Sequence, residues 1–113
     1  MIKFLPKSNR FVFTNDENGQ FAIDERKALS LFGENLKELR GHCGISLQEL
    51  AKLLEIPNQT ISSYENKRHM PSLMQAIKIS AYFDLTVEEF ILCGLDEYPY
   101  DIVELYERRK KGL

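Results

Sequence analysis

Residues 46–66 read SLQELAKLLEIPNQTISSYEN, and this stretch decides the fold that we predict. It opens with the pattern of a capping box, in which Ser46 is the N-cap and Glu49 the third residue of a helix. Apolar residues then recur at helical spacing until residues 55–57 (EIP) interrupt them. A second short helix is expected over residues 58–66. The stretch therefore predicts two helices joined by a tight turn.

The second of these helices has two unlike faces. Ile61 and Tyr64 are its strong apolar residues, and the small Ala51 of the first helix suits a steep crossing. At about 100° per residue, the face opposite Ile61 carries amides and hydroxyls, from Gln59, Ser62, Ser63 and Asn66, with Asn58 at the exposed N-terminal end. Asn and Gln can bond adenine through two hydrogen bonds in the major groove, and hydroxyls suit several bases. We expect this face to read DNA bases.

The bulk composition is that of a globular protein. The 113 residues suggest one domain, and 43% hydrophobic with 28% charged residues argues against a disordered chain. No apolar run approaches the roughly 18 residues that cross a bilayer. The start, MIKFLPKSNR, is not a signal peptide, so a cytoplasmic location without membrane contact is expected. Two cysteines, Cys43 and Cys93, imply no disulfide framework and are interpreted as small buried hydrophobes.

Upstream of the decisive stretch, the sequence predicts an arm and a long helix. Residues 10–14 and 20–23 are β-prone and enclose the turn-forming run 15–19, which predicts a hairpin. From about Asp24 a helical stripe follows, made of Leu29, Phe32, Leu36, Leu39 and Cys43. Gly33 lies off this stripe and could divide the helix into two pieces.

Downstream, three more capping boxes predict three more helices. They pair Ser72 with Gln75, Thr86 with Glu89, and Asp101 with Glu104. The inward residues expected are Leu73, Ala76, Ile77, Ser80 and Ala81 in the first helix, Val87, Phe90 and Ile91 in the second, and Ile102, Leu105 and Tyr106 in the third. We therefore expect an all-α core, with an N-terminal arm over residues 1–23, a helix-turn-helix domain over 24–95, and a C-terminal helix with a basic tail over 96–113.

From FGENLKELR through SLQELA and TISSYEN to LTVEEF, over about residues 32–93, the chain resembles the Cro/C1-type (XRE-like) helix-turn-helix family. The specific matches include a proline and a serine that open the fourth helix. The resemblance implies a five-helix, lambda-repressor-like domain that binds double-stranded DNA, usually as a homodimer, and regulates transcription. We expect a repressor that reads a palindromic operator through helix 58–66.

Matching positions carry expected roles from the family to this chain. The base-reading candidates are Asn58, Gln59, Ser62 and Ser63, and the phosphate-contacting candidates are Ser46, Gln48, Thr60, Asn66, Lys67 and Arg68. Phosphate contacts fix the register but carry little sequence information. Arg40 and Glu65 occupy positions that form a buried ion pair in relatives, so their role would be structural. For Lys67, Arg68 and His69, a DNA contact is favoured over plain surface charge.

The chain departs from the family pattern at four positions. Leu47 stands where Gln often braces the recognition helix and contacts a phosphate. Leu can do neither of these. Glu55 and Lys67 stand where Gly is common, and a left-handed backbone there would cost on the order of 1 kcal/mol. Pro57 replaces a common Ser cap, so Asn58 is predicted to cap the second helix and to be less free for a base.

Other functions are weaker readings of the sequence. The net charge of −2 gives no support for a basic patch, and residues 71–107 hold eight acids against Lys78 alone. An alternative is therefore a protein-interaction module, such as an antitoxin or a partner-controlled regulator with weak DNA binding. A dimer could form through Ile102, Leu105 and Tyr106 or through Phe11, Phe13 and Phe21. Two histidines, two cysteines and no phosphate loop predict no metal site, no cofactor and no enzymatic activity.

Overall fold

The N-terminal arm pairs two short strands ahead of the first helix. The computed structural model describes residues 13–15, 21–91, 94, 101, 104, 107 and 108, with side chains from Asp24 onward. Strand β1 (Phe13–Asn15) runs antiparallel to β2 (Phe21–Ile23), with Thr14 opposite Ala22. This is the pairing that the hairpin pattern predicts, with β1 placed slightly later in the chain than expected.

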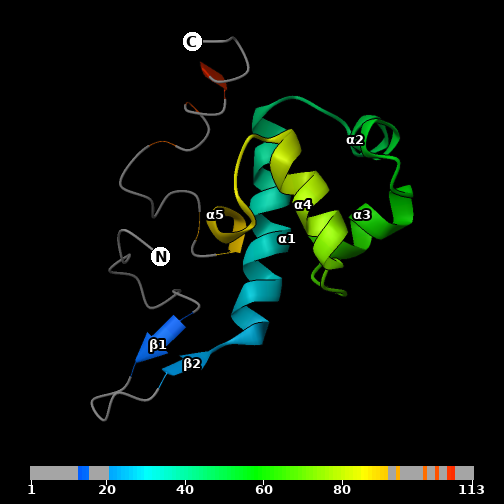
Figure 1. The fold of residues 1–113 in the computed structure, drawn as a ribbon. Helices are drawn as coiled ribbons and strands as arrows, with labels where there is room; N and C mark the ends of the chain where they lie inside the picture. The colour runs from blue at the N-terminus through cyan, green and yellow to red at the C-terminus, as the bar shows by residue number, and fades with distance from the viewer. Residues whose placement is uncertain are drawn as a thin grey trace.

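Helix α1 (Glu25–His42) is the longest element and lies at the centre of the fold (Figure 1). It begins where the Asp24 carboxylate accepts a hydrogen bond from the Lys27 N–H at 3.1 Å, which satisfies a donor that the first turn leaves open. Contacts to α3 and α5 bury much of its surface. The proposed division of this helix at Gly33 is wrong, because α1 is continuous there and Gly33 is buried in its middle.

Four shorter helices complete the fold, and α2, α4 and α5 begin at the predicted caps. They are α2 (Leu47–Leu54), α3 (Asn58–Glu65), α4 (Leu73–Tyr82) and α5 (Val87–Ile91). Both hydrogen bonds of the capping box form at Ser46 with Glu49 and at Thr86 with Glu89. At Ser72 the hydroxyl accepts from the Gln75 N–H at 3.2 Å. Together with the arm, these elements give the all-α, five-helix architecture expected from the sequence.

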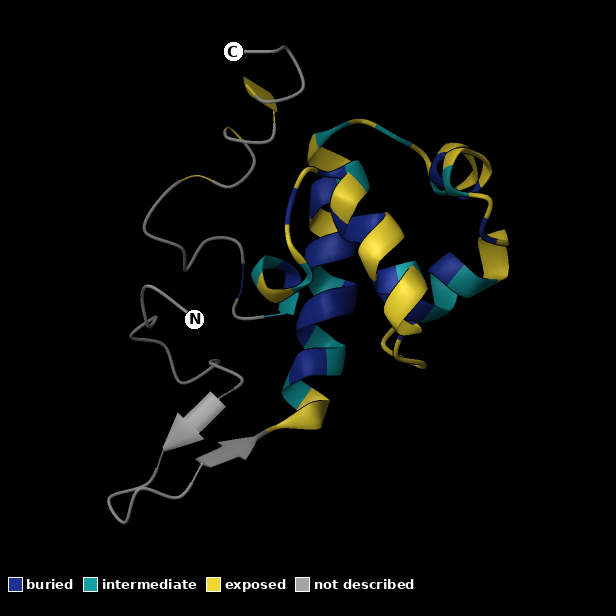
Figure 2. Ribbon diagram, in the orientation of Figure 1, coloured by how far each residue is buried: buried dark blue, intermediate teal, exposed yellow. Residues whose placement is uncertain are grey.

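Three phenylalanine rings hold the helices together. The centroid of Phe90 lies 5.0 Å from that of Phe32 and 6.0 Å from that of Phe83, and all three residues are buried. Tyr64 adds an edge-to-face contact with Phe32 at 6.4 Å. Such ring pairs stabilise a core beyond the area that they bury. Through them, α1, α3, α5 and the end of α4 share one core (Figure 2).

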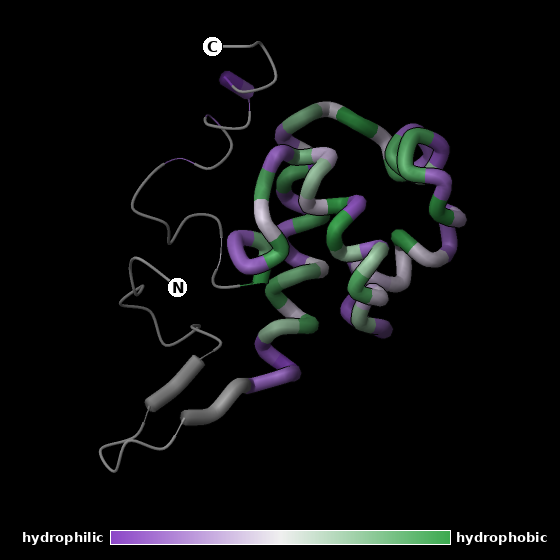
Figure 3. Tube along the Cα trace, viewed as in Figure 1, coloured by the Kyte–Doolittle hydropathy of each residue, from purple (hydrophilic) through white to green (hydrophobic). Residues whose placement is uncertain are grey.

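The buried side of α4 differs from the predicted stripe. Ala76 and Ser80 are buried as expected, but Leu73 is 75% exposed, Ile77 is 44% exposed and Ala81 is exposed as well. The core contact is completed by Ile79, which lies next to Ser80 on the same face. Apolar residues lie on more than one side of this helix (Figure 3). Hydrophobic spacing therefore identified the helix but could not decide which of its apolar sides turns inward.

Most of the predicted C-terminal helix lies outside the described residues. The Asp101 carboxylate accepts a hydrogen bond from the Glu104 N–H at 3.1 Å, as its predicted capping box requires. Glu104, Glu107 and Arg108 have helical backbone. The two sets of residues offered for a dimer contact are outside the described side chains, so both remain predictions. In the part of the chain that the structure describes, no helix combines the length and apolar character needed to span a membrane.

Gly33 permits the close approach of α1 and α3. A Cβ added to Gly33 would overlap the carbonyl oxygen of Tyr64 and lie 3.3 Å from that of Glu65. Both are backbone atoms, which cannot rotate away. We therefore expect Gly33→Ala to lower the free energy of unfolding by about 2–3 kcal/mol, measured by urea denaturation.

Gly41 provides the matched control, because it is exposed in the same helix and an added Cβ would meet nothing within 4 Å. Gly41→Ala should raise the free energy of unfolding by about 0.5–1 kcal/mol through helix propensity. Equal effects at the two glycines would contradict the steric explanation for Gly33.

Candidate nucleic-acid interface

Helices α2 and α3 meet through a short turn with a left-handed residue. Leu50 and Ala51 are buried on α2, and Ile56 in the turn is buried beside them. The Ile56 N–H donates to the Ala51 carbonyl at 3.0 Å, and Glu55 has φ 56° and ψ 42°. The small side chain of Ala51 leaves space for α3 to cross. The turn predicted from the sequence therefore forms, with the left-handed backbone that the family's common glycine would fit.

The N-terminus of α3 differs from the prediction. Pro57, not Asn58, is the N-cap, and it provides no side-chain hydrogen bond. Its carbonyl accepts from the N–H groups of Thr60 and Ile61, at 3.0 and 3.2 Å. Asn58 is thus already the first helical residue. Proline fixes φ at a value that suits the N-cap, the position directly before the first helical residue. The prediction that Asn58 caps this helix is wrong, and its side chain is exposed.

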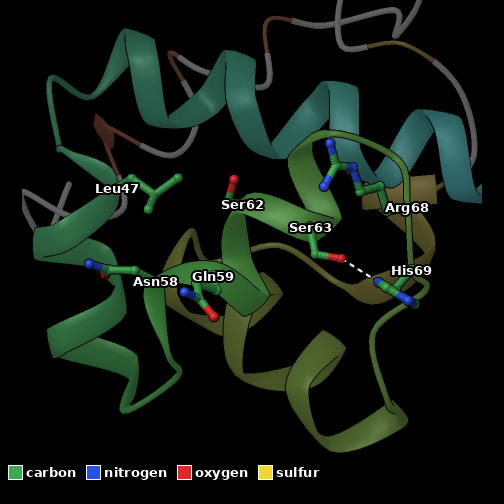
Figure 4. Close-up of a pocket in the computed structure, with 7 residues that line it drawn as sticks. All are labelled: Leu47, Asn58, Gln59, Ser62, Ser63, Arg68 and His69. Carbon is green, nitrogen blue, oxygen red and sulfur yellow. Dashed lines mark hydrogen bonds between the residues drawn. The ribbon is translucent and has the colours of Figure 1, made fainter.

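The polar face of α3 lines a hollow of about 400 Å³. All four base-reading candidates lie on its wall, namely Asn58, Gln59, Ser62 and Ser63 (Figure 4). Leu47 of α2 closes one side, and Arg68 and His69 from the segment after α3 close the other. On the opposite face of α3, Ile61 and Tyr64 are buried in the core. The structure therefore brings the predicted polar face together on an accessible surface.

The six phosphate candidates are placed less uniformly than the base-reading set. Only Arg68 lines the hollow. The Ser46 hydroxyl already accepts the capping hydrogen bond from the Glu49 N–H at 3.0 Å, and Gln48 beside it is exposed. The hydrogen bonds from Ser46 lower the pKa of the Glu49 carboxyl. This cap is therefore complete near neutral pH and weakens as the pH falls into the range where that carboxyl binds a proton.

Three further phosphate candidates lie on α3 or directly after it. Thr60 is half-buried, and the Asn66 amide donates to the Ser62 hydroxyl at 3.2 Å. Lys67 follows with φ 61°, and its Nζ lies 3.6 Å from a carboxylate oxygen of Glu34 on α1. The N–H groups of Lys67 and Arg68 donate to Tyr64 and Ser63 carbonyls, which is the Schellman arrangement at a helix end. Lys67 thus occupies a left-handed position that favours glycine.

Two residues of the hollow were given no specific role from the sequence, although a DNA contact was favoured for His69. Leu47 had been noted only as a departure from the family's glutamine, and it is half-buried against the core. His69 directly follows Lys67 and Arg68 in the segment after α3. Its Nδ1 lies 2.5 Å from the Ser63 hydroxyl (Figure 4). No sequence pattern pairs two residues six apart across a helix end, so only the folded turn reveals this contact.

Arg40 and Glu65 tie α1 to α3 behind the polar face. Arg40 donates through Nε to Oε2 of Glu65 at 2.7 Å and through Nη2 to Oε1 at 3.1 Å. Its Nη1 also donates to the Ile45 carbonyl at 3.1 Å, ahead of α2. The Glu65 side chain is 5% exposed and that of Arg40 is 20% exposed. The hydrogen bond to Glu65 raises the pKa of Arg40 above its ordinary value, so the arginine of this pair stays positively charged.

Comparison with known proteins identifies this two-helix unit. A family model described as helix-turn-helix matches residues 36–90. The chain is 33% identical over 54 residues to an HTH-type transcriptional regulator of Bacillus subtilis, covering 48% of this chain and 82% of that protein. It is 31% identical over 74 residues to one of Archaeoglobus fulgidus, covering 66% and 94%.

Two further similarities differ in extent. An HTH-type transcriptional regulatory protein of Methanococcus vannielii is 39% identical over 57 residues, which cover 50% of this chain and only 17% of that protein. The crystal structure of a hypothetical transcription factor from Neisseria superimposes with a TM-score of 0.56, covering 80% of this chain and 90% of that one. At 22% identity, this last likeness speaks for the fold alone.

Breaking the Arg40–Glu65 pair from one side should be costly. Arg40→Met leaves a buried carboxylate without its partner, so we expect the free energy of unfolding to fall by about 3 kcal/mol. The double variant Arg40→Met with Glu65→Leu should lose clearly less than the sum of the single variants, which chemical denaturation of all four proteins would measure.

The exposed pair formed by His42 and Glu38, 3.9 Å apart, is the control for this cycle. Glu38→Ala should change the free energy of unfolding by less than about 1 kcal/mol. Additive losses from Arg40→Met and Glu65→Leu would count against a coupled buried pair.

Proposed function

Because this chain belongs to the Cro/C1-type helix-turn-helix family, we propose that it is a sequence-specific, DNA-binding transcriptional regulator that acts as a repressor. The observation that carries this proposal is the accessible polar face of α3. That face offers amides and hydroxyls, which suit base edges in the major groove. An α-helix of this width fits that groove, and α3 is anchored from behind by Ile61, Tyr64 and Glu65.

The contacts divide into two groups with different consequences. We assign base reading to Asn58, Gln59, Ser62 and Ser63, and phosphate contacts to Ser46, Gln48, Thr60, Asn66, Lys67 and Arg68. Gln59 is exposed on the wall of the hollow, where its amide can form paired hydrogen bonds to adenine. Lys67 can exchange its exposed ion pair with Glu34 for a phosphate at little cost, since such surface pairs contribute less than about 1 kcal/mol.

A palindromic operator fits a homodimer of this domain, which we place at residues 24–95. Two recognition helices would then enter successive major grooves about 34 Å apart. Selection of duplexes from a random library tests this proposal directly, since it returns the half-site and its spacing together. The expected result is an inverted repeat with half-sites one helical turn apart, bound with a steep loss of affinity as salt is raised. Failure to enrich any duplex at low salt would overturn the proposal.

A second candidate is a regulator controlled by a protein partner. An exposed apolar row on α4 favours it, formed by Leu73, Met74 and Ile77, with the exposed Met70 in the segment just before the helix. These residues follow helical spacing, and large exposed apolar surfaces often mark contact sites. A partner that co-purifies in a fixed ratio, with no DNA retained at low salt, would support this alternative over operator binding.

Gln59 and Lys67 should respond differently to substitution. We expect Gln59→Ala to relax the preference at one base pair, with a loss of about tenfold for the selected site and little change for random DNA. Lys67→Gly should weaken all sequences alike and lower the salt slope by about 1. Affinities measured on the selected and a scrambled duplex at several salt concentrations separate the two effects.

Glu55→Gly is the matched control for Lys67→Gly. Both substitutions place glycine at a left-handed residue, so each should gain about 1 kcal/mol of stability. Only Lys67→Gly should reduce DNA affinity, because it removes a cation next to Arg68, whereas Glu55 lies in the turn between α2 and α3 and is not a proposed DNA contact. Equal losses of affinity from Gln59→Ala and Lys67→Gly on both duplexes would contradict the assigned roles.

A further inference from the structure

The hydrogen bond between Ser63 and His69 joins a base-reading candidate to an imidazole, a group that can gain or lose a proton or move it between its two nitrogens. The Ser63 hydroxyl and Nδ1 of His69 are 2.5 Å apart, on the wall of the hollow (Figure 4). Ser63 belongs to α3 and is half-buried, whereas His69 lies in the segment between α3 and α4 and is exposed. The serine is therefore held from one side by the imidazole, with its other side toward the hollow.

A hydroxyl has one proton, so its partner decides what it can offer elsewhere. A neutral imidazole that carries its proton on Nε2 accepts at Nδ1, and the serine proton is then committed to the histidine. Only the lone pairs of Ser63 remain for a base. A protonated imidazole instead donates from Nδ1, which leaves the Ser63 proton available. The two states of His69 thus turn Ser63 from an acceptor into a donor.

Bound DNA would itself select between the tautomers of the neutral ring. Phosphate oxygens accept hydrogen bonds and cannot donate them. An Nε2 that faces a phosphate must therefore carry the proton, and Nδ1 must then accept from Ser63. Since His69 directly follows Arg68, itself a phosphate candidate, this arrangement agrees with the assigned position of the DNA backbone.

We propose that His69 is a positioning residue that sets the direction of the Ser63 hydroxyl proton, and through it the kind of base that Ser63 reads. With neutral His69, Ser63 favours a base whose major-groove edge offers an amino group, adenine or cytosine. With protonated His69, Ser63 favours a base that offers a keto oxygen, guanine or thymine. This inference rests on the proposed function, because it presumes that α3 lies against duplex DNA.

The surroundings of His69 make this change of preference separable from other titrations. The remaining residues that line the hollow are Leu47, Asn58, Gln59, Ser62, Ser63 and Arg68. Arginine stays protonated at all relevant pH values, and the others are uncharged. Lys67 and Glu34 lie next to the segment that carries His69 and pair with each other, with 3.6 Å between Nζ of Lys67 and Oε2 of Glu34. Among the residue types that line the hollow, only histidine ordinarily changes its charge between about pH 5 and 8.

The test compares four duplexes at two pH values. Selection from random duplexes with the full chain first identifies the operator, and Ser63→Ala then identifies the base pair that Ser63 reads. Affinities are measured for the four base pairs at that position, at about pH 8 and about pH 5.5. We expect the ratio of amino-base to keto-base affinity to fall by about fivefold or more on acidification, the size of one hydrogen bond exchanged for another. A general gain from the added positive charge acts on all four duplexes and cancels in this ratio.

Three variants complete the experiment. His69→Gln and Ser63→Ala should each make the ratio independent of pH, and thermal melts confirm that both remain folded. His42→Gln should leave the pH dependence intact, because His42 lies on α1 beside Glu38 and does not line the hollow. A ratio that does not vary with pH, or that still varies in His69→Gln, would overturn the inference while operator binding stands. Absence of any selected duplex would instead overturn the proposed function, and this inference with it.

Discussion

The close contact between α1 and α3 at Gly33 is the constraint on which the rest of the structure depends. No side chain separates the two backbones there, and the Tyr64 carbonyl occupies the space that a Cβ would need. The Arg40–Glu65 pair fixes the same two helices further along α1. One contact sets their separation and the other sets their register. Because the second also reaches the Ile45 carbonyl, the start of α2 is fixed to the same frame.

This constraint explains how so short a helix can expose a polar face. Helix α3 has eight residues, and an isolated helix of that length is not stable in water. Its stability must come from the side that Ile61, Tyr64 and Glu65 bury against α1 and the core. The opposite side of α3 is then not needed for packing. Small amides and hydroxyls can be placed there for recognition without weakening the fold.

The same segment stores strain where the proposed contacts lie. Lys67 and Glu55 both adopt a left-handed backbone conformation. For any residue other than glycine, this conformation lowers stability by about 1 kcal/mol. At Lys67 the strained position carries a cationic side chain next to Arg68, on the proposed DNA side of the molecule. The turn that strains Lys67 also brings His69 back to Ser63. The strained backbone and the proposed phosphate contacts therefore fall on the same few residues at the end of α3.

The helices could be predicted from the sequence alone, because most of their signals are local. The caps at Ser46, Ser72 and Thr86 each need a partner three residues away, and such a pair can be seen in the sequence alone. The two-faced pattern of α3 was equally visible, and it predicted all four residues of α3 that line the hollow.

How these elements pack against one another became visible only in the folded structure. Periodicity cannot choose between two apolar sides, so the inward side of α4 depended on how it packs against its neighbours. Gly33 looked like an interruption because its role depends on Tyr64, a residue 31 positions further along the chain. Asn58 looked like a cap because Pro57 acts as the N-cap through its backbone and not through its side chain. His69 joined the site through a turn whose geometry no spacing rule encodes. Local hydrogen bonds can be predicted from neighbouring residues, whereas close packing depends on distances between parts of the chain that only folding brings together.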